Sequence, residues 1–204
     1  MRKILVAAMA LGFTLTIAVP VAGARTCGLT EMGQWSEWGV PGQEQTIEGA
    51  IDVGIDNRGD VFVSDERNGM IHVFTTAGDY RRSFPAASPH GLTVDNRKVY
   101  NASWGESKVQ VFDKAGNLLV EWSEWDEDGT LMRFELPLFI DVDAGGFIYV
   151  TDLGLDQVRK FSPDGEWVTT FGEGATAVSV HGARAYVTNP AGKIDLFTLD
   201  GDYL

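Results

Sequence analysis

The sequence is poor in cysteine, in positive charge and in histidine. Cys27 is the single cysteine among 204 residues, so no disulfide can form within the chain and the fold must be stable through its packed core alone. Sixteen Lys and Arg stand against 29 Asp and Glu, and a net charge of −13 offers no basic stripe for phosphates. These shortages exclude a disulfide-stapled domain and argue against nucleic acid as a partner.

Long apolar runs are absent except at the N-terminus. Arg2 and Lys3 precede an uncharged apolar stretch over residues 4–19, and small residues around Gly23 follow it. This pattern is typical of a secretory signal peptide, and the stretch is shorter than the roughly 20 residues that span a bilayer. We expect a signal peptide over 1–24 and a secreted or periplasmic chain over 25–204 without a membrane span; an uncleaved N-terminal anchor is the alternative.

Glycine and aromatic residues, in contrast, are plentiful. The chain has 24 Gly, 11% aromatic residues and 44% hydrophobic residues, which excludes a disordered or collagenous protein. A chain with this composition is rich in turns and has large side chains to bury. We therefore expect a packed domain built from short elements.

The body of the chain is a repeat with four copies. Each copy has an aromatic residue early in a short apolar run: Phe62, Tyr100, Tyr149 and Tyr186. Each has a Phe that ends the next apolar run: Phe74, Phe112, Phe161 and Phe197. Each has a Gly four residues later: Gly78, Gly116, Gly165 and Gly201. The spacing between successive Phe residues is 38, 49 and 36, which is the period of a propeller blade.

The runs in each copy are short and are separated by hairpin punctuation. Gly, Asn, Asp and Pro bound apolar runs of four to six residues, and the Gly after each Phe sits where a tight turn needs a positive φ. We predict an all-β fold, a β-propeller of about four four-stranded blades. The repeats are expected at about 51–84, 90–122, 138–171 and 176–204.

Several motifs resemble the NHL repeat family. Pro89-His90-Gly91-Leu92-Thr93-Val94-Asp95 matches the opening of that repeat, and Val61–Asp65 and Ile148–Asp152 match its middle. The resemblance covers about residues 33–204 and implies a β-propeller, usually closed with six blades. Four copies then predict a propeller that is partial or truncated relative to that ring.

The N-terminus carries a second clue about how the sheets end. Trp35-Ser36-Glu37-Trp38 recurs as Trp122-Ser123-Glu124-Trp125, which closes the outer strand of the second copy. We therefore predict an outer strand over 30–38. It could complete the fourth blade in a closed four-bladed ring; in an open arc, free sheet edges would permit self-association.

In a propeller, the loops between second and third strands and those between blades share one face, where partners usually bind. The candidate ligand-binding residues on this loop face are Trp104, Arg67, Asp65, Glu106, His90, Asp152 and Asp156. Trp104 is the leading candidate, because a large aromatic residue in a loop is more often contact surface than core. For Asp65 and Asp152, which end strands, the competing interpretation is that they cap loop amides.

One acidic stretch has the spacing of a calcium-binding loop. Its four candidate ligands are Glu124, Asp126, Asp128 and Glu135. The first position of such a loop should be Asp, and the flanking residues are typical of strands, so a solvated acidic linker is the preferred interpretation. We expect no other cofactor or metal.

The sequence favours a non-catalytic binding scaffold over an enzyme. It shows no serine triad, phosphate-binding loop or dinucleotide fingerprint, and its three histidines fall at different phases of the repeat. We expect propeller loops that bind a protein, peptide or glycan ligand. The alternative is a periplasmic lactonase or lyase that uses a divalent metal in the propeller channel.

Overall fold

The computed structural model describes residues 37–38 and 45–204. The predicted signal peptide, Cys27 and most of the predicted strand 30–38 lie outside these residues. The chain divides into two units, Met1–Thr46 and Ile47–Leu204. In the first unit, β1 (Glu37–Trp38) pairs antiparallel with β2 (Gln45–Thr46). In the described part of the chain, no helix is long and apolar enough to cross a membrane.

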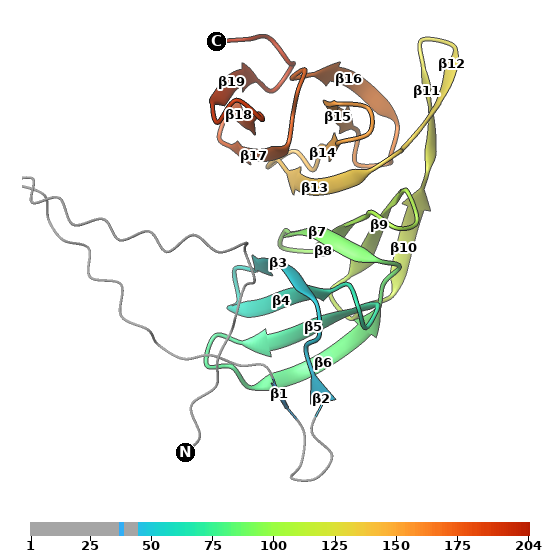
Figure 1. Ribbon diagram of the computed structural model, residues 1–204. Helices are drawn as coiled ribbons and strands as arrows, with labels where there is room; N and C mark the ends of the chain where they lie inside the picture. The colour runs from blue at the N-terminus through green and yellow to red at the C-terminus, as the bar shows by residue number, and fades with distance from the viewer. Residues whose placement is uncertain (1–36, 39–44) are drawn as a thin grey trace, which may run out of the picture. The chain divides into compact units, whose positions relative to one another are not determined.

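The second unit contains four successive antiparallel sheets, whose strands follow chain order (Figure 1). The first sheet is β3 (Ala50–Ile55), β4 (Asp60–Asp65), β5 (Met70–Thr75) and β6 (Tyr80–Pro85). The second is β7 (Pro89–Val94), β8 (Lys98–Ser103), β9 (Lys108–Asp113) and β10 (Leu118–Trp122). The third is β13 (Pro137–Val142), β14 (Ile148–Asp152), β15 (Gln157–Phe161) and β16 (Trp167–Phe171). The fourth has β17 (Ala177–His181), β18 (Arg184–Thr188) and β19 (Ile194–Thr198).

This architecture confirms the predicted all-β partial propeller of about four blades. The first strands of neighbouring sheets contact each other in order, β3 with β7, β7 with β13 and β13 with β17. The fourth sheet has three full strands, and its fourth position is marked by a single bridge between Phe197 and Tyr203.

The turns between third and fourth strands have the predicted geometry. Gly78, Gly116 and Gly165 have φ values of 89°, 94° and 88°, a region in which a side chain would be strained. The turn that contains Gly116 is closed by Asp113, whose Oδ1 accepts from the amides of Ala115 and Asn117 at 2.9 Å each. Thr75 and Ser162 take the place of Asp113 in the other two turns, where their hydroxyl oxygens accept from the turn amides. The sequence signal at these turns is therefore a Thr, Asp or Ser that starts the turn and a glycine that completes it.

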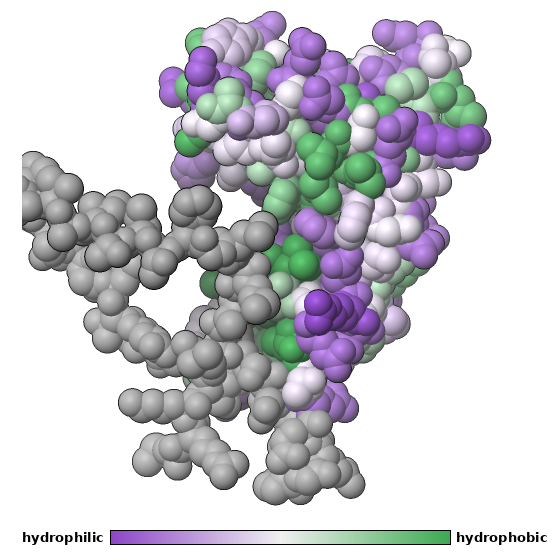
Figure 2. Space-filling model, in the orientation of Figure 1, coloured by the Kyte–Doolittle hydropathy of each residue, from purple (hydrophilic) through white to green (hydrophobic). Residues whose placement is uncertain are grey.

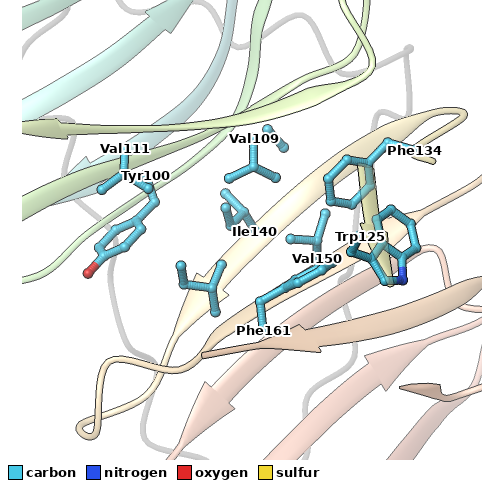
Figure 3. Packing of buried hydrophobic residues seen from close by; sticks show 10 residues of the cluster. Tyr100, Val109, Val111, Trp125, Phe134, Ile140, Val150 and Phe161 are labelled. Carbon is cyan, nitrogen blue, oxygen red and sulfur yellow. The ribbon is translucent and has the colours of Figure 1, made fainter. Parts of the chain in front are cut away.

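The core lies in the junctions between sheets rather than within any one sheet. In Figure 3, Tyr100, Val109 and Val111 of the second sheet face Ile140, Val150 and Phe161 of the third. Corresponding clusters fill the junction before it and the junction after it. Because the second and third sheets bury both faces against neighbouring sheets, stability depends on the succession of sheets.

A hairpin is inserted between the second and third sheets and accounts for the long spacing of 49 between Phe112 and Phe161. It consists of β11 (Glu124–Glu127) and β12 (Thr130–Arg133). Trp125 and Phe134 at its base are buried and lie 5.4 and 5.6 Å from the ring of Phe161. The predicted linker is therefore an ordered hairpin whose base belongs to the core.

Candidate functional site

The loops between the second and third strands hold most of the candidate binding residues. These loops comprise residues 66–69, 104–107, 153–156 and 189–193. Main-chain hydrogen bonds tie two of them to the segment that precedes the same sheet: Glu66 N donates to Gly49 O at 2.9 Å, and Leu153 N donates to Leu136 O at 2.9 Å. The loop face is thus a set of braced turns.

Asp65 and Asp152 are the braces of two of these loops. Both are fully buried. Asp65 accepts from the amides of Glu48 and Gly49 at 3.1 and 2.9 Å. Asp152 accepts in the same way from the amides of Glu135 and Leu136, each at 2.9 Å. The structure gives these two candidates the capping role, with no carboxylate surface exposed to a ligand.

The electrostatics of Asp65 follow from these bonds. Burial alone would raise the pKa of the Asp65 carboxyl, but the hydrogen bonds from Glu48, Asn68 and Gly49 outweigh it and hold that pKa below its usual range. His72 Nε2 lies 3.2 Å from Asp65 Oδ2. Burial lowers the pKa of the His72 imidazole, and Asp65 opposes this in part. Asp65 therefore remains ionised at neutral pH as an acceptor for the loop amides.

Trp104 and His90, which lie 14 residues apart in the sequence, are brought together. Their ring centroids are 6.0 Å apart and the rings meet edge to face. His90 also meets Phe139 edge to face at 5.8 Å, and its Nδ1 donates to Leu138 O at 3.1 Å. The other ring nitrogen of a neutral His90, Nε2, is then an acceptor without a hydrogen-bond partner among the described residues. Trp104 keeps 42% of its surface exposed.

The loop that carries Trp104 is fixed on both sides. Gly105 packs so closely on Ser88 that a Cβ there would lie 2.6 Å from Ser88 Oγ. On the other side, Ser107 adopts φ 48° and its Oγ donates to Glu135 O at 3.0 Å. Trp104 is therefore an exposed aromatic residue on a rigid support, which lowers the entropy lost when a ligand binds to it.

The remaining candidates lie on three different loops. Glu106, Asp156 and Arg67 are exposed, and none forms a salt bridge within the described residues. Asp156 has φ 58°, a left-handed conformation that Asp tolerates better than most residues. Arg67 lies in the loop of the first sheet, beside Gly49. The loop of Trp104 thus carries one exposed carboxylate, that of Glu106.

The four predicted calcium ligands are not brought together. Glu124 receives a hydrogen bond from Arg133 Nε at 2.8 Å, and Asp126 Oδ1 accepts from Gly129 N at 2.7 Å in the hairpin turn. Asp128 lies in that turn, and Glu135 follows the second hairpin strand. Among the described residues, no group of three or more His, Cys, Asp and Glu could hold a metal ion. An extended hairpin separates side chains that a loop would have gathered.

Two carboxylates on the first strands were not among the sequence candidates. Asp52 Oδ2 accepts from Leu92 N at 2.9 Å, and burial raises the pKa of this carboxyl above its usual value. Asp141 Oδ2 accepts from Val180 N at 2.7 Å, and its Oδ1 accepts from Thr93 Oγ1 at 3.1 Å. The signal in the sequence was an acidic residue inside an apolar run that forms the first strand of a repeat. Both carboxylates join neighbouring sheets through the first strands.

Comparison with known proteins supports the fold and leaves the activity open. No family model and no curated protein sequence matches the chain. Virginiamycin B lyase from Staphylococcus aureus superposes with a TM-score of 0.59 at 15% identity, over 74% of this chain and 54% of that chain. A nidogen/laminin complex gives 0.60 at 19% identity, over 77% and 64%. Glutaminyl cyclase from Myxococcus xanthus gives 0.55 at 15% identity, over 79% and 77%.

These similar structures are β-propeller proteins, and the chain has their fold. The chain spans little more than half the length of the lyase structures, 54% and 55%. Enzymes and a protein in complex with its partner both occur among them, so the fold does not choose between catalysis and binding.

Proposed function

We propose that this chain is an exported, non-catalytic binding module of the NHL type that holds a protein, peptide or glycan ligand on its loop face. The observation that carries the proposal is Trp104, which is 42% exposed yet held by His90 and a braced loop. Exposed aromatic residues on rigid supports are the usual anchors of binding interfaces. The repeat motifs and the N-terminal apolar stretch support the family and the export.

The charge around Trp104 favours a ligand with basic side chains. Glu106 is exposed in the same loop, and the chain as a whole carries −13. A lysine or arginine side chain could lie over the indole ring and meet the carboxylate at once, a combination that attracts cations at close range. The same field raises the rate at which a basic peptide reaches the site and makes that rate sensitive to salt.

The test is binding to an array of peptides rich in Lys and Arg, together with acidic peptides and neutral oligosaccharides. We expect the basic peptides to bind, and Trp104→Ala to weaken that binding by at least about tenfold. Leu119→Ala is the control, because Leu119 is 53% exposed but belongs to β10, outside the loop face. Equal binding by Trp104→Ala and the unchanged chain would contradict the proposal.

A further inference from the structure

His90 places a polar side chain at a repeat position that is apolar in the neighbouring sheets. It follows Pro89, which pairs with Ser103, and the corresponding positions in the first and third sheets hold Ile51 and Leu138. An aliphatic side chain therefore satisfies the packing of a first strand at this position. The imidazole is a departure from the repeat that the fold does not require, and such departures are expected at functional sites.

The imidazole of His90 is fixed in one orientation. Trp104 and Phe139 meet it edge to face, with ring centroids 6.0 and 5.8 Å away. Its Nδ1 bonds to Leu138 O at 3.1 Å, and because a carbonyl oxygen can only accept, Nδ1 carries the proton of the neutral ring. The lone pair of the neutral imidazole is therefore on Nε2.

The Nε2 atom of His90 is an acceptor open to solvent. No described residue donates to it, and it does not belong to the buried polar atoms of the described chain that have no partner. Trp104 beside it is 42% exposed. Because the two ring centroids are only 6.0 Å apart, a ligand group that lies on the indole ring has this acceptor within reach.

The surroundings of His90 favour a donor that is positively charged. Asp52, on the neighbouring strand β3, lies close enough for its charge to interact with that of His90. Glu106 is exposed in the loop of Trp104. On the side of the unit seen in Figure 2, hydrophobic residues gather along the region where the first strands lie in Figure 1, so an aliphatic stem also finds apolar surface there. A long side chain that ends in a charged N–H donor matches all three features.

We propose that His90 is a specificity-determining residue of the loop face, whose Nε2 accepts a hydrogen bond from the charged N–H group of a basic ligand side chain that lies against Trp104. This inference rests on the binding function proposed above and adds one requirement, that the ligand cation carries an N–H. An aromatic surface alone makes no such demand, because it attracts a quaternary ammonium as well as a primary one. A hydrogen bond from a cation is stronger than one between neutral groups, so its loss is measurable.

The test compares three hexapeptides of alternating lysine and glycine, whose lysines are unmodified, dimethylated or trimethylated. All three carry the same charge, but only the first two keep an N–H donor on each side chain. We expect calorimetry at neutral pH to give similar affinities for the unmodified and dimethylated peptides, and an affinity at least about fivefold lower for the trimethylated peptide. The dimethylated peptide is the matched control for the added methyl groups.

Two variants of His90 assign this preference to Nε2. Phenylalanine keeps a ring between Trp104 and Phe139 but has no acceptor, so His90→Phe should bind the three peptides equally, and the unmodified one more weakly than the unchanged chain does. In His90→Gln, the amide oxygen can accept in place of Nε2 and should restore part of the preference. His181→Phe, at an exposed position on β17, is the control that should keep the original order of affinities.

The possible failures are distinguishable. A trimethylated peptide that binds as tightly as the dimethylated one would overturn this inference and leave the proposed function standing, with the cation held by the indole ring and Glu106. The same preference in His90→Phe as in the unchanged chain would also overturn it, because another acceptor would then impose the N–H requirement. Absence of binding by all three peptides would contradict the proposed function and this inference with it.

Discussion

The hydroxyl of Tyr100 donates a hydrogen bond to Asp95 Oδ2 at 2.8 Å. The same bond recurs one sheet later, where the hydroxyl of Tyr149 donates to Asp143 Oδ2 at 3.0 Å. In both sheets the aspartate closes the turn between the first two strands, and the buried tyrosine fixes that turn to the sheet. Burial, with the nearby carboxylate, raises the pKa of both phenols, so they stay protonated and act as donors.

Removing this hydroxyl should destabilise the fold. Tyr100→Phe leaves Asp95 without one of its donors, and we expect a loss of about 0.5–1.5 kcal/mol in the free energy of unfolding. Tyr186→Phe is the matched control, since His181 replaces the aspartate in the fourth sheet and the Tyr186 hydroxyl has no hydrogen-bond partner among the described residues. Urea unfolding of both variants measures the difference, and equal losses would contradict this role.

The repeat pattern was sufficient to predict the sheets because it records local chemistry. Phe74, Phe112 and Phe161 each end a third strand or lie one residue before its end, and the Gly four residues later takes the positive φ that was expected. Asp65 and Asp152 could be assigned a capping role because a carboxylate at the end of a strand has loop amides within reach.

Contacts between repeats could not be predicted in the same way. His90 and Trp104 occupy different phases of the repeat, and their meeting depends on a loop geometry fixed by Ser88 and Gly105. The hairpin of β11 and β12 was not predicted, because its acidic residues are as typical of a solvated linker as of exposed strands. Trp125 and Phe134, at the base of the hairpin, are large enough to indicate burial, and both side chains lie in the junction between the second and third sheets.

The buried carboxylate of Asp152 offers a sharp test of loop bracing. Asp152→Asn replaces an oxygen by an amino group that faces backbone N–H donors, because Glu135, Leu136 and Gly154 all donate to this side chain. We expect a loss of about 1–3 kcal/mol in the free energy of unfolding, measured with urea. Asp156→Asn should change it by less than about 0.5 kcal/mol, since that side chain is exposed and Asn also tolerates its left-handed conformation.

Two glycines at the sheet junctions lie so close to the neighbouring sheet that alanine does not fit, and we predict that only one of the two alanine substitutions can be compensated. A Cβ at Gly91 would lie 2.2 Å from Leu138 O, which is backbone, whereas a Cβ at Gly54 would lie 2.4 Å from Val94 Cγ2, which is a side chain. Both Gly→Ala changes should destabilise the fold by about 1–3 kcal/mol through overpacking.

Of these two changes, only Gly54→Ala should be compensated by a second substitution. Val94→Ala removes the clashing methyl group, so the double variant Gly54→Ala/Val94→Ala should be more stable than the sum of the single changes implies, as a double-mutant cycle would show. Gly91→Ala has no such partner because the obstacle is main chain. Additive losses of stability for Gly54→Ala and Val94→Ala would contradict this prediction, because they would mean that the first junction accommodates the new Cβ without any change at Val94.

The pair of His72 and Asp65 predicts how stability depends on pH. Burial lowers the pKa of His72 below its usual value of 6.5, so the unfolded chain takes up a proton at a higher pH than the folded chain does. Stability should therefore be full above about pH 6.5 and fall as the pH drops below it. The pKa values of Asp56 and Asp65 are held below 3.8, so these carboxyls titrate outside this window.

Urea unfolding between pH 7.5 and 5.5 measures this slope. His72→Gln should flatten it, and His181→Gln, at an exposed position, serves as the control. The 3.2 Å contact between His72 Nε2 and Asp65 Oδ2 makes the opposite result informative. If stability rose as the pH fell, and His72→Gln removed the rise, the attraction of the Asp65 carboxylate for a protonated imidazole would exceed the cost of burying that charge. A stability that decreases as the pH falls means that burial dominates. The neutral His72 imidazole is then the donor and the ionised Asp65 carboxylate is the acceptor.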